Sequence, residues 1–282
     1  MPTKYNPERK KIEEVSRDEY IRINKQYLDL NKIKRIVFKV GSSPLENPIF
    51  FYNIADNLSR LVKEYNKEVL LVSSGAVMLG RKKLGHKKED SIMSKQAYAS
   101  VGQPILIDKY EAAFGEYKQE IGQILLTWND LDKENEASYK NTVDTLEDLL
   151  KHKIIPIINE NDTTSTKEMQ FGENDILARL TTNAIDADLA VYITNLSGLY
   201  DKNPREKDNS IINLVPKIDE YILSISGDTK AENGNEFGTG GMKSKIESIK
   251  LLEKPTGLII GKENFTIEKI FLDYTHNGTL FL

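Results

Sequence analysis

The sequence contains no cysteine, a single tryptophan and only three histidines among its 282 residues. Without cysteine, disulfide bonds, thiol catalysis and zinc sites built from thiolates are excluded. No apolar run approaches the ~18 residues of a membrane-crossing helix, and the N-terminus has no apolar core of the signal-peptide type. The net charge of −4 disfavours a general nucleic-acid-binding surface. We therefore expect a cytoplasmic protein with neither a membrane nor a nucleic acid as partner.

The composition is that of a globular protein, with 39 % hydrophobic and 29 % charged residues. A chain of this length buries a substantial core, as one large domain or two small ones. Residues 1–33 are rich in Lys, Arg and Glu, and we expect an N-terminal extension with a short amphipathic helix near residues 20–30. The histidines (His86, His152 and His276) stand in polar or mixed surroundings, so we expect them at the surface.

Short apolar runs rich in β-branched residues alternate with longer segments of helical type. The runs lie at residues 36–38, 69–72, 121–126, 154–158, 189–193 and 258–260, and the helical segments at 49–66, 76–84, 92–118, 139–151, 174–186 and 242–253. Continuous apolar runs are typical of strands that are buried on both faces, as in a parallel sheet. The alternation predicts an α/β fold with helices on both faces of a mainly parallel sheet.

Small, polar or glycine residues follow four of the predicted strands, at residues 39–43, 73–76, 159–162 and 194–195. In open α/β sheets, ligands bind beyond the carboxyl ends of the strands. Loops favour the same residue types for turn formation alone. Because four loops share the pattern, and two carry glycine at a strand-to-helix junction, we expect a binding site at this edge.

Residues 237–245 read Phe-Gly-Thr-Gly-Gly-Met-Lys-Ser-Lys and open a segment with helical spacing. Glycine lets backbone N–H groups approach a ligand, and a helix start adds unpaired N–H groups and partial positive charge. The pattern predicts a cradle for nucleotide phosphates, although a flexible linker before a helix gives the same residues.

The polar segment 195–238 is longer than a simple connection between two elements of secondary structure. We expect it to flank the nucleotide, with a hairpin and short helix near 211–225 and a mobile part at 226–237.

With these features assembled, residues 34–282 resemble the amino acid kinase family and, within it, the glutamate 5-kinase group. The Lys-x-Gly, Ser-Gly-Ala and Thr-Gly-Gly-Met elements (residues 39–41, 74–76 and 239–242) mark the wider family. The Ser-Lys-Gln, Asn-Glu-Asn-Asp and Gly-x-Asn-Asp elements (residues 94–96, 159–162 and 172–175) select the glutamate kinases. The resemblance implies a three-layer α/β/α sandwich. It makes residues 34–282 one catalytic domain without the RNA-binding-like PUA domain that many relatives append.

The resemblance implies ATP-dependent phosphorylation of the γ-carboxylate of L-glutamate to L-glutamyl 5-phosphate, the first step of proline biosynthesis. ATP and Mg²⁺ are the implied cofactors, and no dedicated metal ligands are apparent in the sequence. The resemblance also makes proline a candidate feedback inhibitor. The helical segments 92–118 and 139–151 offer a face for self-association, and we expect a homodimer or a homotetramer.

The resemblance also implies roles for individual residues. Lys39 and Lys245 would neutralise the transferring phosphoryl group from opposite sides of a cleft, with Asp175 orienting both lysines by salt bridges. Ser74, Gly75, Asp162 and Asn174 would bind glutamate, although Asn and Asp also cap helices and turns. The nucleotide side would consist of Lys39, Gly41, Thr194, Asn195, Thr239, Gly240, Gly241, Met242, Lys243, Ser244 and Lys245.

Two residues depart from the family pattern: Asn195 and Glu173 each stand where Asp is common. Two alternatives stay open from the sequence. One is an amino acid kinase for aspartate, acetylglutamate, carbamate or a nucleotide. The other is a catalytically silent regulatory protein that binds glutamate or proline; Asn195 favours it, whereas the retained Lys39, Asp175 and Lys245 speak against it.

Overall fold

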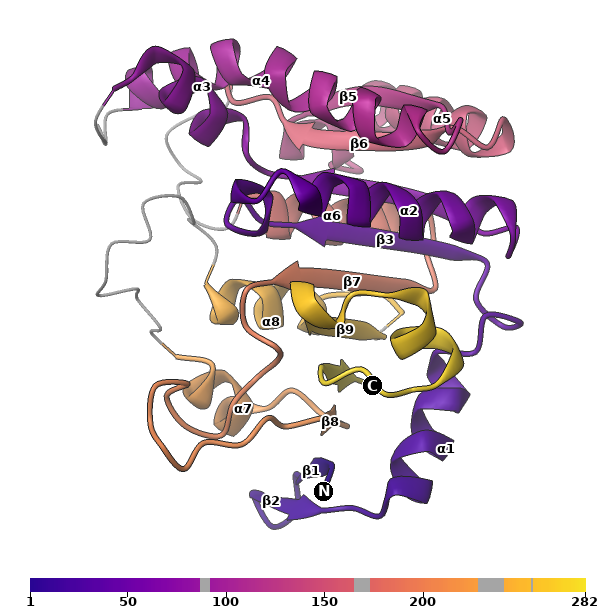
Figure 1. Cartoon of the computed structure of the whole chain (residues 1–282), viewed down its shortest axis with the longest axis vertical. Helices are drawn as coiled ribbons and strands as arrows, with labels where there is room; N and C mark the ends of the chain where they lie inside the picture. The colour runs from indigo at the N-terminus through magenta and orange to yellow at the C-terminus, as the bar shows by residue number, and fades with distance from the viewer. Residues whose placement is uncertain (87–91, 165–172, 228–240, 255) are drawn as a thin grey trace.

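A computed structural model describes residues 1–86, 92–164, 173–227, 241–254 and 256–282 (Figure 1). These residues form a ten-stranded sheet in the order β2-β1-β8-β10-β9-β7-β3-β4-β6-β5. The strands are β1 Thr3–Asn6, β2 Lys11–Glu14, β3 Arg35–Val40, β4 Glu68–Ser73, β5 Ile121–Leu126, β6 Ile155–Glu160, β7 Leu189–Thr194, β8 Leu214–Val215, β9 Gly257–Gly261 and β10 Thr279–Phe281. From β9 to β5 all neighbours pair in parallel.

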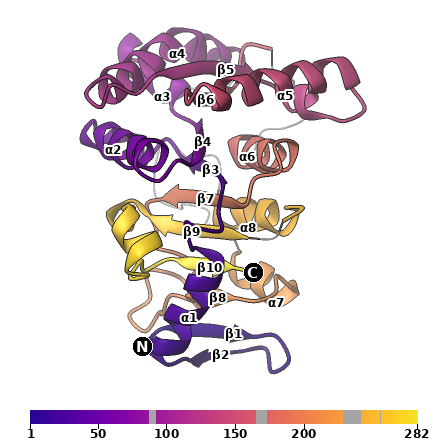
Figure 2. The same ribbon diagram turned by 90° about the vertical axis from the view of Figure 1, so that its right-hand side faces the viewer.

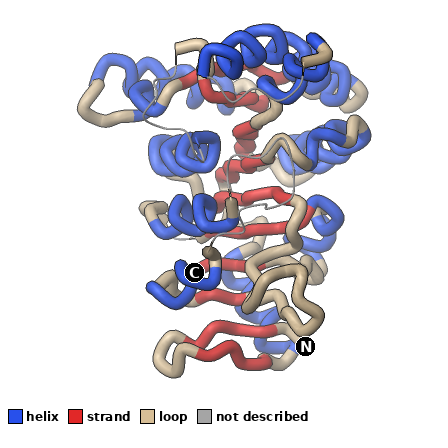
Figure 3. Tube along the Cα trace, turned by 90° about the vertical axis from the view of Figure 1, so that its left-hand side faces the viewer, coloured by secondary structure: helices blue, strands red, loops and turns tan. Residues whose placement is uncertain are grey.

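Helices pack on both faces of this sheet. They are α1 Arg17–Tyr27, α2 Ile49–Lys63, α3 Ala76–Leu84, α4 Ile92–Gly115, α5 Glu136–Lys151, α6 Glu173–Ala184, α7 Glu220–Ile225 and α8 Met242–Lys250. Figure 2 shows α2, α3 and α4 on one side and α5, α6 and α8 on the other, and Figure 3 shows the strands as a column between the helices. The predicted α/β/α sandwich with a mainly parallel sheet is confirmed. No helix in the described part of the chain is long and apolar enough to cross a membrane.

The alternation of side chains along β3 separates the two halves of the core. Ile36, Phe38 and Val40 pack toward α2 and α4, whereas Val37 packs on the opposite face with α5, α6 and α8. Because successive strand residues point to opposite faces, Lys39 shares the face of Val37. A charged side chain in a buried strand is therefore directed toward α6 and α8.

The predicted strands and helices are all present, with shifts of a few residues at their ends. The short helix expected near 211–225 is α7. The hairpin expected there is wrong, because Tyr200 and Ile211 form only an isolated antiparallel bridge and β8 instead pairs with β1 and β10. Most of the segment expected to be mobile, 226–237, lies outside the described residues.

The N-terminal segment contains the predicted helix, α1, but also a hairpin, β1–β2, that the sequence pattern does not predict. Within β1 only Tyr5 is buried, and the β2 strand, Lys-Ile-Glu-Glu, is half exposed. The hairpin joins the sheet through Lys4 opposite Leu214. The division of the chain after residue 33 stays a prediction.

The prediction that all three histidines lie at the surface is wrong for His276, which is 2 % exposed. Its Nε2 lies 2.8 Å from Asn24 Oδ1, and its carbonyl oxygen accepts a hydrogen bond from Tyr20 Oη at 2.9 Å. Burial lowers the pKa of His276 to about 4. A neutral imidazole here joins α1 to the C-terminal segment, a contact that its polar sequence neighbours do not reveal.

Replacing Gly102 with alanine is expected to destabilise the protein, because α3 and α4 pack backbone against backbone at this residue. A Cβ on Gly102 would lie 1.8 Å from the Ala76 carbonyl oxygen. Overpacking of this kind typically lowers the free energy of unfolding by about 1–3 kcal/mol, measurable by urea denaturation. Gly115→Ala on the same helix is the control, since nothing lies within 4 Å of a Cβ there. Equal stability of the two variants would contradict the close approach.

Candidate functional site

The carboxyl ends of the central strands meet at one edge of the sheet. Val40 at the end of β3 pairs with Ser73 of β4 on one side and with Ile193 of β7 on the other. The arrowheads of β3, β6 and β7 point to the same side in Figure 1. The loops predicted to carry the site therefore leave the sheet side by side.

A buried cluster of three charged side chains lies near the carboxyl end of β3. Lys39 Nζ is 2.5 Å from Asp175 Oδ1, and Lys245 Nζ is 3.3 Å from Asp175 Oδ2. Asp175 is 0 %, Lys39 4 % and Lys245 5 % exposed. Ser244 Oγ donates to Asp175 Oδ2 at 2.8 Å. The structure thus joins two lysines that are far apart in sequence through one carboxylate.

The cluster forms because each charged residue occupies a position that its element buries. Asp175 shares the inner face of α6 with Ala178 and Thr182, and all three are buried. On α8, Lys245 follows Met242 by three residues and precedes Ile249 by four. Residues at this spacing lie on one helix face. Lys39 meets both helices because it points to their side of the sheet.

Burial and charge act against each other in the cluster. Burial alone would raise the pKa of Asp175, but Lys245, Lys39 and the hydroxyl of Ser244 hold that pKa below its ordinary value. Burial, together with repulsion by Lys39, lowers the pKa of Lys245 to about 8 against the attraction of Asp175. At neutral pH the cluster holds two cations and one anion. A surplus positive charge in a dehydrated site favours an anionic ligand.

The first turn of α8 carries part of the predicted phosphate cradle. Gly241 is the N-cap residue and Lys245 Nζ donates to its carbonyl oxygen at 3.3 Å. Met242 is buried, whereas the side chain of Lys243 is exposed. Unpaired N–H groups at a helix start suit a phosphate. Thr239 and Gly240 lie outside the described residues.

The remaining residues predicted for the nucleotide side lie at neighbouring strand ends. Thr194 is the last residue of β7, and the next residue, Asn195, is exposed. Gly41 directly follows β3, and a Cβ there would meet only Pro44, at 4.0 Å. No steric demand of the described residues therefore requires glycine at position 41.

Ser74 and Asn174, both predicted to bind glutamate, are joined by a hydrogen bond. Asn174 Nδ2 donates to Ser74 Oγ at 2.9 Å and lies 3.1 Å from Asn159 Oδ1. Gly75 begins α3 with φ +116°, a left-handed conformation that glycine adopts without strain. The start of α3 and the start of α6 therefore face each other across the end of β4.

Asp162 lines a pocket that also contains Gln103, a second hydrogen-bond partner of Asn159 besides Asn174. The pocket is lined by Ala99, Ser100, Gln103, Pro104, Ile107, Gln123, Leu125, Glu160, Asn161, Asp162 and Thr163. Burial raises the pKa of Asp162 to about 6. Asn159 Nδ2 donates to Gln103 Oε1 at 2.8 Å, which links this pocket to Asn174. Asn159 and Gln103 were not predicted as site residues, although Asn159 begins the Asn-Glu-Asn-Asp element.

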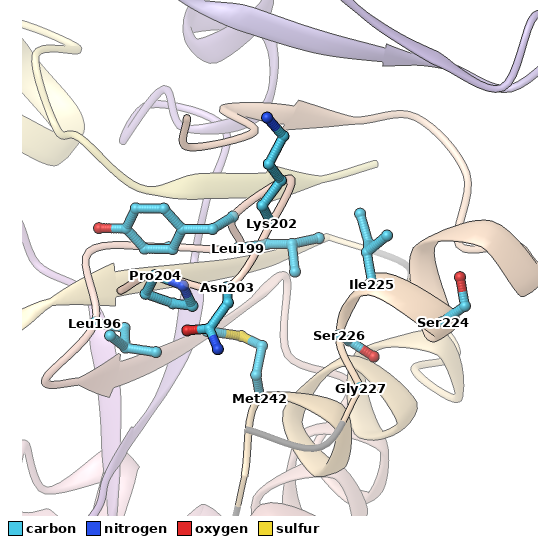
Figure 4. A pocket seen from close by; sticks show the side chains of 12 residues that line it. Leu196, Leu199, Lys202, Asn203, Pro204, Ser224, Ile225, Ser226, Gly227 and Met242 are labelled. Carbon is cyan, nitrogen blue, oxygen red and sulfur yellow. The ribbon is translucent and has the colours of Figure 1, made fainter. Parts of the chain in front are cut away.

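A further pocket opens beside the start of α8 (Figure 4). It is called here the base pocket, because the segment 195–238 that forms most of it is predicted to flank a nucleotide. It is lined by Leu196, Gly198, Leu199, Tyr200, Lys202, Asn203, Pro204, Ser224, Ile225, Ser226, Gly227 and Met242. Figure 4 shows the side chains of Met242 and Asn203 among those that line it. The pocket is thus built mainly from the polar segment expected to flank a nucleotide.

The described residues contain no group of three or more His, Asp and Glu side chains placed to hold a metal ion. Within the charged cluster, Asp175 is already engaged by Lys39, Lys245 and Ser244. The described part of the site therefore gives Mg²⁺ no ligand set of its own.

Comparisons with known proteins agree with this architecture. The model of the amino acid kinase family matches residues 34–254. A glutamate 5-kinase of Desulfotalea psychrophila is 39 % identical over 263 residues, covering 89 % of this chain and 68 % of the relative. Glutamate 5-kinases of Clostridium acetobutylicum and Alkaliphilus metalliredigens are 38 % and 40 % identical, covering 90 % and 89 % of this chain and 96 % and 97 % of theirs.

Two solved structures share the fold at 13 % sequence identity. The aspartate kinase from Synechocystis has a TM-score of 0.58 and covers 88 % of this chain and 40 % of its own. The isopentenyl phosphate kinase of T. acidophilum has a TM-score of 0.55 and covers 88 % of this chain and 100 % of its own.

Proposed function

This chain belongs to the amino acid kinase family, and from that premise we propose that it phosphorylates the γ-carboxylate of L-glutamate with ATP. The product is L-glutamyl 5-phosphate, the first intermediate of proline biosynthesis. The observation that carries the proposal is the buried Lys39–Asp175–Lys245 cluster at the carboxyl edge of the sheet. The glutamate 5-kinase relatives support the choice of substrate.

The reaction needs no base to activate its nucleophile. A glutamate side chain has an unperturbed pKa of roughly 4.3, so its γ-carboxylate is ionised at neutral pH. One carboxylate oxygen attacks the γ-phosphorus of ATP, and the bond from that phosphorus to the bridging oxygen breaks as ADP leaves. The obstacle is repulsion between two anions, and catalysis then depends on positive charge and in-line positioning.

Lys39 and Lys245 supply that positive charge from two sides, one from β3 and one from α8. Asp175 acts as a positioning residue, because its two carboxylate oxygens fix both ammonium groups. It also opposes the loss of the Lys245 proton that burial favours. The charge is preorganised before substrates bind, so little reorganisation is needed during transfer.

Glutamate binds on the side of β4 and β6. The Ser74 hydroxyl, the Asn174 amide and the N–H groups at the start of α3 would hold its α-carboxylate. Asp162 would accept from its α-ammonium group, and the positive charge of the substrate would lower the pKa of this buried carboxyl. The hydrogen bond from Asn159 to Gln103 fixes the Asn159 amide, whose oxygen in turn accepts from Asn174.

ATP binds on the side of β7 and α8. The phosphates would lie over Gly241–Lys245, with Thr194 and Asn195 nearby, and the base would enter the base pocket. Mg²⁺ arrives with the nucleotide as part of the substrate, where it neutralises charge on phosphate oxygens.

The proposal includes four further points that rest on the sequence and the family. The protein is cytoplasmic, it assembles as a homodimer or a homotetramer, and proline is its candidate feedback inhibitor. Residues 34–282 form the catalytic domain and residues 1–33 an extension, a division supported by the family match that starts at residue 34.

A single assay tests the function. Purified protein is incubated with ATP, Mg²⁺ and hydroxylamine, and hydroxamate and ADP are measured with glutamate, aspartate or acetylglutamate as acceptor. We expect hydroxamate with glutamate alone, since hydroxylamine traps the acyl phosphate. Turnover only with another acceptor would place the activity elsewhere in the family. Saturable glutamate binding without turnover would instead identify a regulatory protein.

A further inference from the structure

The N-terminal strand β1 is hydrogen-bonded to Ile211 and Asp219, each of which adjoins a segment that lines the base pocket. In Figure 2, β1 lies beside β8, with α7 next to them. We propose that β1 positions the nucleotide site: Tyr5 holds one wall of the base pocket and Thr3 holds the other, so the first residues of the chain set its affinity for ATP. The inference rests on the proposed function, because it takes the base pocket as the nucleotide site.

Tyr5 anchors the wall that ends α7. Its Oη donates to Asp219 Oδ2 at 2.7 Å, and its ring stacks on Tyr221 with centroids 5.3 Å apart and planes 10° apart. Asp219 is also the N-cap residue of α7, where Oδ1 accepts from the N–H of Ile222 at 3.1 Å. The last residues of α7 and those that follow it, Ser224 to Gly227, line the pocket.

Thr3 anchors the opposite wall. Its Oγ1 donates to the carbonyl oxygen of Ile211 at 2.5 Å, and its N–H donates to Asn213 Oδ1 at 3.0 Å. Ile211 forms the bridge with Tyr200, which lines the pocket. The next residue, Ile212, donates to the carbonyl oxygen of Leu199, another lining residue, at 2.8 Å.

These walls depend on an external anchor because the elements of secondary structure next to them are short. Helix α7 spans six residues and β8 spans two. Helices below ~12–15 residues are marginal in isolation, so tertiary contacts must hold α7 in place. Tyr5 is 0 % exposed and contacts both the cap and the first turn of this helix. Moving α7 would displace one side of the pocket, whereas the charged cluster lies on β3, α6 and α8.

The test compares Tyr5→Phe with the unmodified protein in the full chain. Losing a hydrogen bond to a carboxylate reduces the fraction of molecules with α7 in place, and apparent affinity scales with that fraction. We expect the KM for ATP to rise about tenfold, with the KM for glutamate and kcat at saturating ATP within about twofold. The affinity for ADP, measured by calorimetric titration, should fall by the same factor as that for ATP. Thr3→Val removes the hydrogen bond to Ile211 and should likewise raise the KM for ATP while leaving the KM for glutamate and kcat within about twofold.

Tyr20→Phe is the matched control. It also removes a phenol hydroxyl from a buried N-terminal tyrosine, but that hydroxyl donates to the His276 carbonyl oxygen, away from the base pocket. We expect its KM for ATP to stay unchanged even if its thermal stability falls as much as that of Tyr5→Phe.

The two variants and the unmodified protein together distinguish a failure of this inference from a failure of the proposed function. An unchanged KM for ATP in Tyr5→Phe and Thr3→Val, or an equal rise for both substrates, overturns the inference while leaving the proposed function intact. If Tyr5→Phe does not fold, Thr3→Val decides alone. Failure of the unmodified protein to bind ADP or use ATP would instead remove the proposed function, before any variant is compared.

Discussion

Replacing Lys245 with methionine is expected to reduce kcat about 10³-fold, because the proposed mechanism places its ammonium group against the charge that develops during phosphoryl transfer. Removing one preorganised electrostatic contact typically lowers kcat by about 10²–10³, and a cation placed on the transferring group contributes up to about 10⁵. Methionine keeps the length and apolar stem of lysine, so α8 should retain its packing against α6. Steady-state turnover with saturating ATP and glutamate measures the effect.

Binding of glutamate should be nearly unchanged in Lys245→Met. Lys245 lies on α8, whereas the residues assigned to glutamate lie at the starts of α3 and α6 and after β6. Lys250→Met is the matched control, since this lysine ends the same helix and is exposed. It should leave kcat within about twofold, because an exposed charge is screened by solvent. A large loss of glutamate affinity in Lys245→Met would show that Lys245 lies on the glutamate side.

Much of the fold could be predicted from the sequence because the central strands are buried on both faces. Runs such as Val69–Val72 are then continuously apolar and stand out from their surroundings. Helix α3 could be placed to the residue, since Gly75 and Gly85 bracket it and both adopt positive φ. The β1–β2 hairpin gave no such signal, because four-residue strands with one buried side chain resemble a charged coil.

The location of the site could be predicted from the sequence, but not all of the contacts between its residues. Residue pattern alone pointed to the strand ends, and family resemblance was needed to pair Lys39 with Lys245. The structure adds the physical cause of that pairing, the alternation along β3 and the inner faces of α6 and α8. The Asn159–Gln103 bond and the burial of His276 against Asn24 could not be inferred, because each joins segments that only the tertiary fold brings together.

Asp175→Asn is expected to weaken both stability and catalysis, because the change leaves two buried ammonium groups without their counter-charge. Breaking a buried ion pair by removing one partner typically lowers the free energy of unfolding by about 3–5 kcal/mol. Asp186→Asn is the matched control: Asp186 is an exposed carboxylate 2.9 Å from Lys254 Nζ, and exposed pairs contribute about 0–1 kcal/mol. Urea denaturation of both variants measures the difference.

The pH dependence of Asp175→Asn separates a catalytic consequence from simple destabilisation. In the unmodified protein, kcat/KM for ATP should fall as pH rises through about 8, because Lys245 loses its proton there. Asp175 is the group that raises the pKa of Lys245 against burial and Lys39, so its removal lowers that pKa further. The alkaline fall of kcat/KM should then begin at lower pH, with less activity left at pH 7. A variant that is less stable but keeps the pH profile of the unmodified protein would show that Asp175 supports the fold without holding the charge on Lys245.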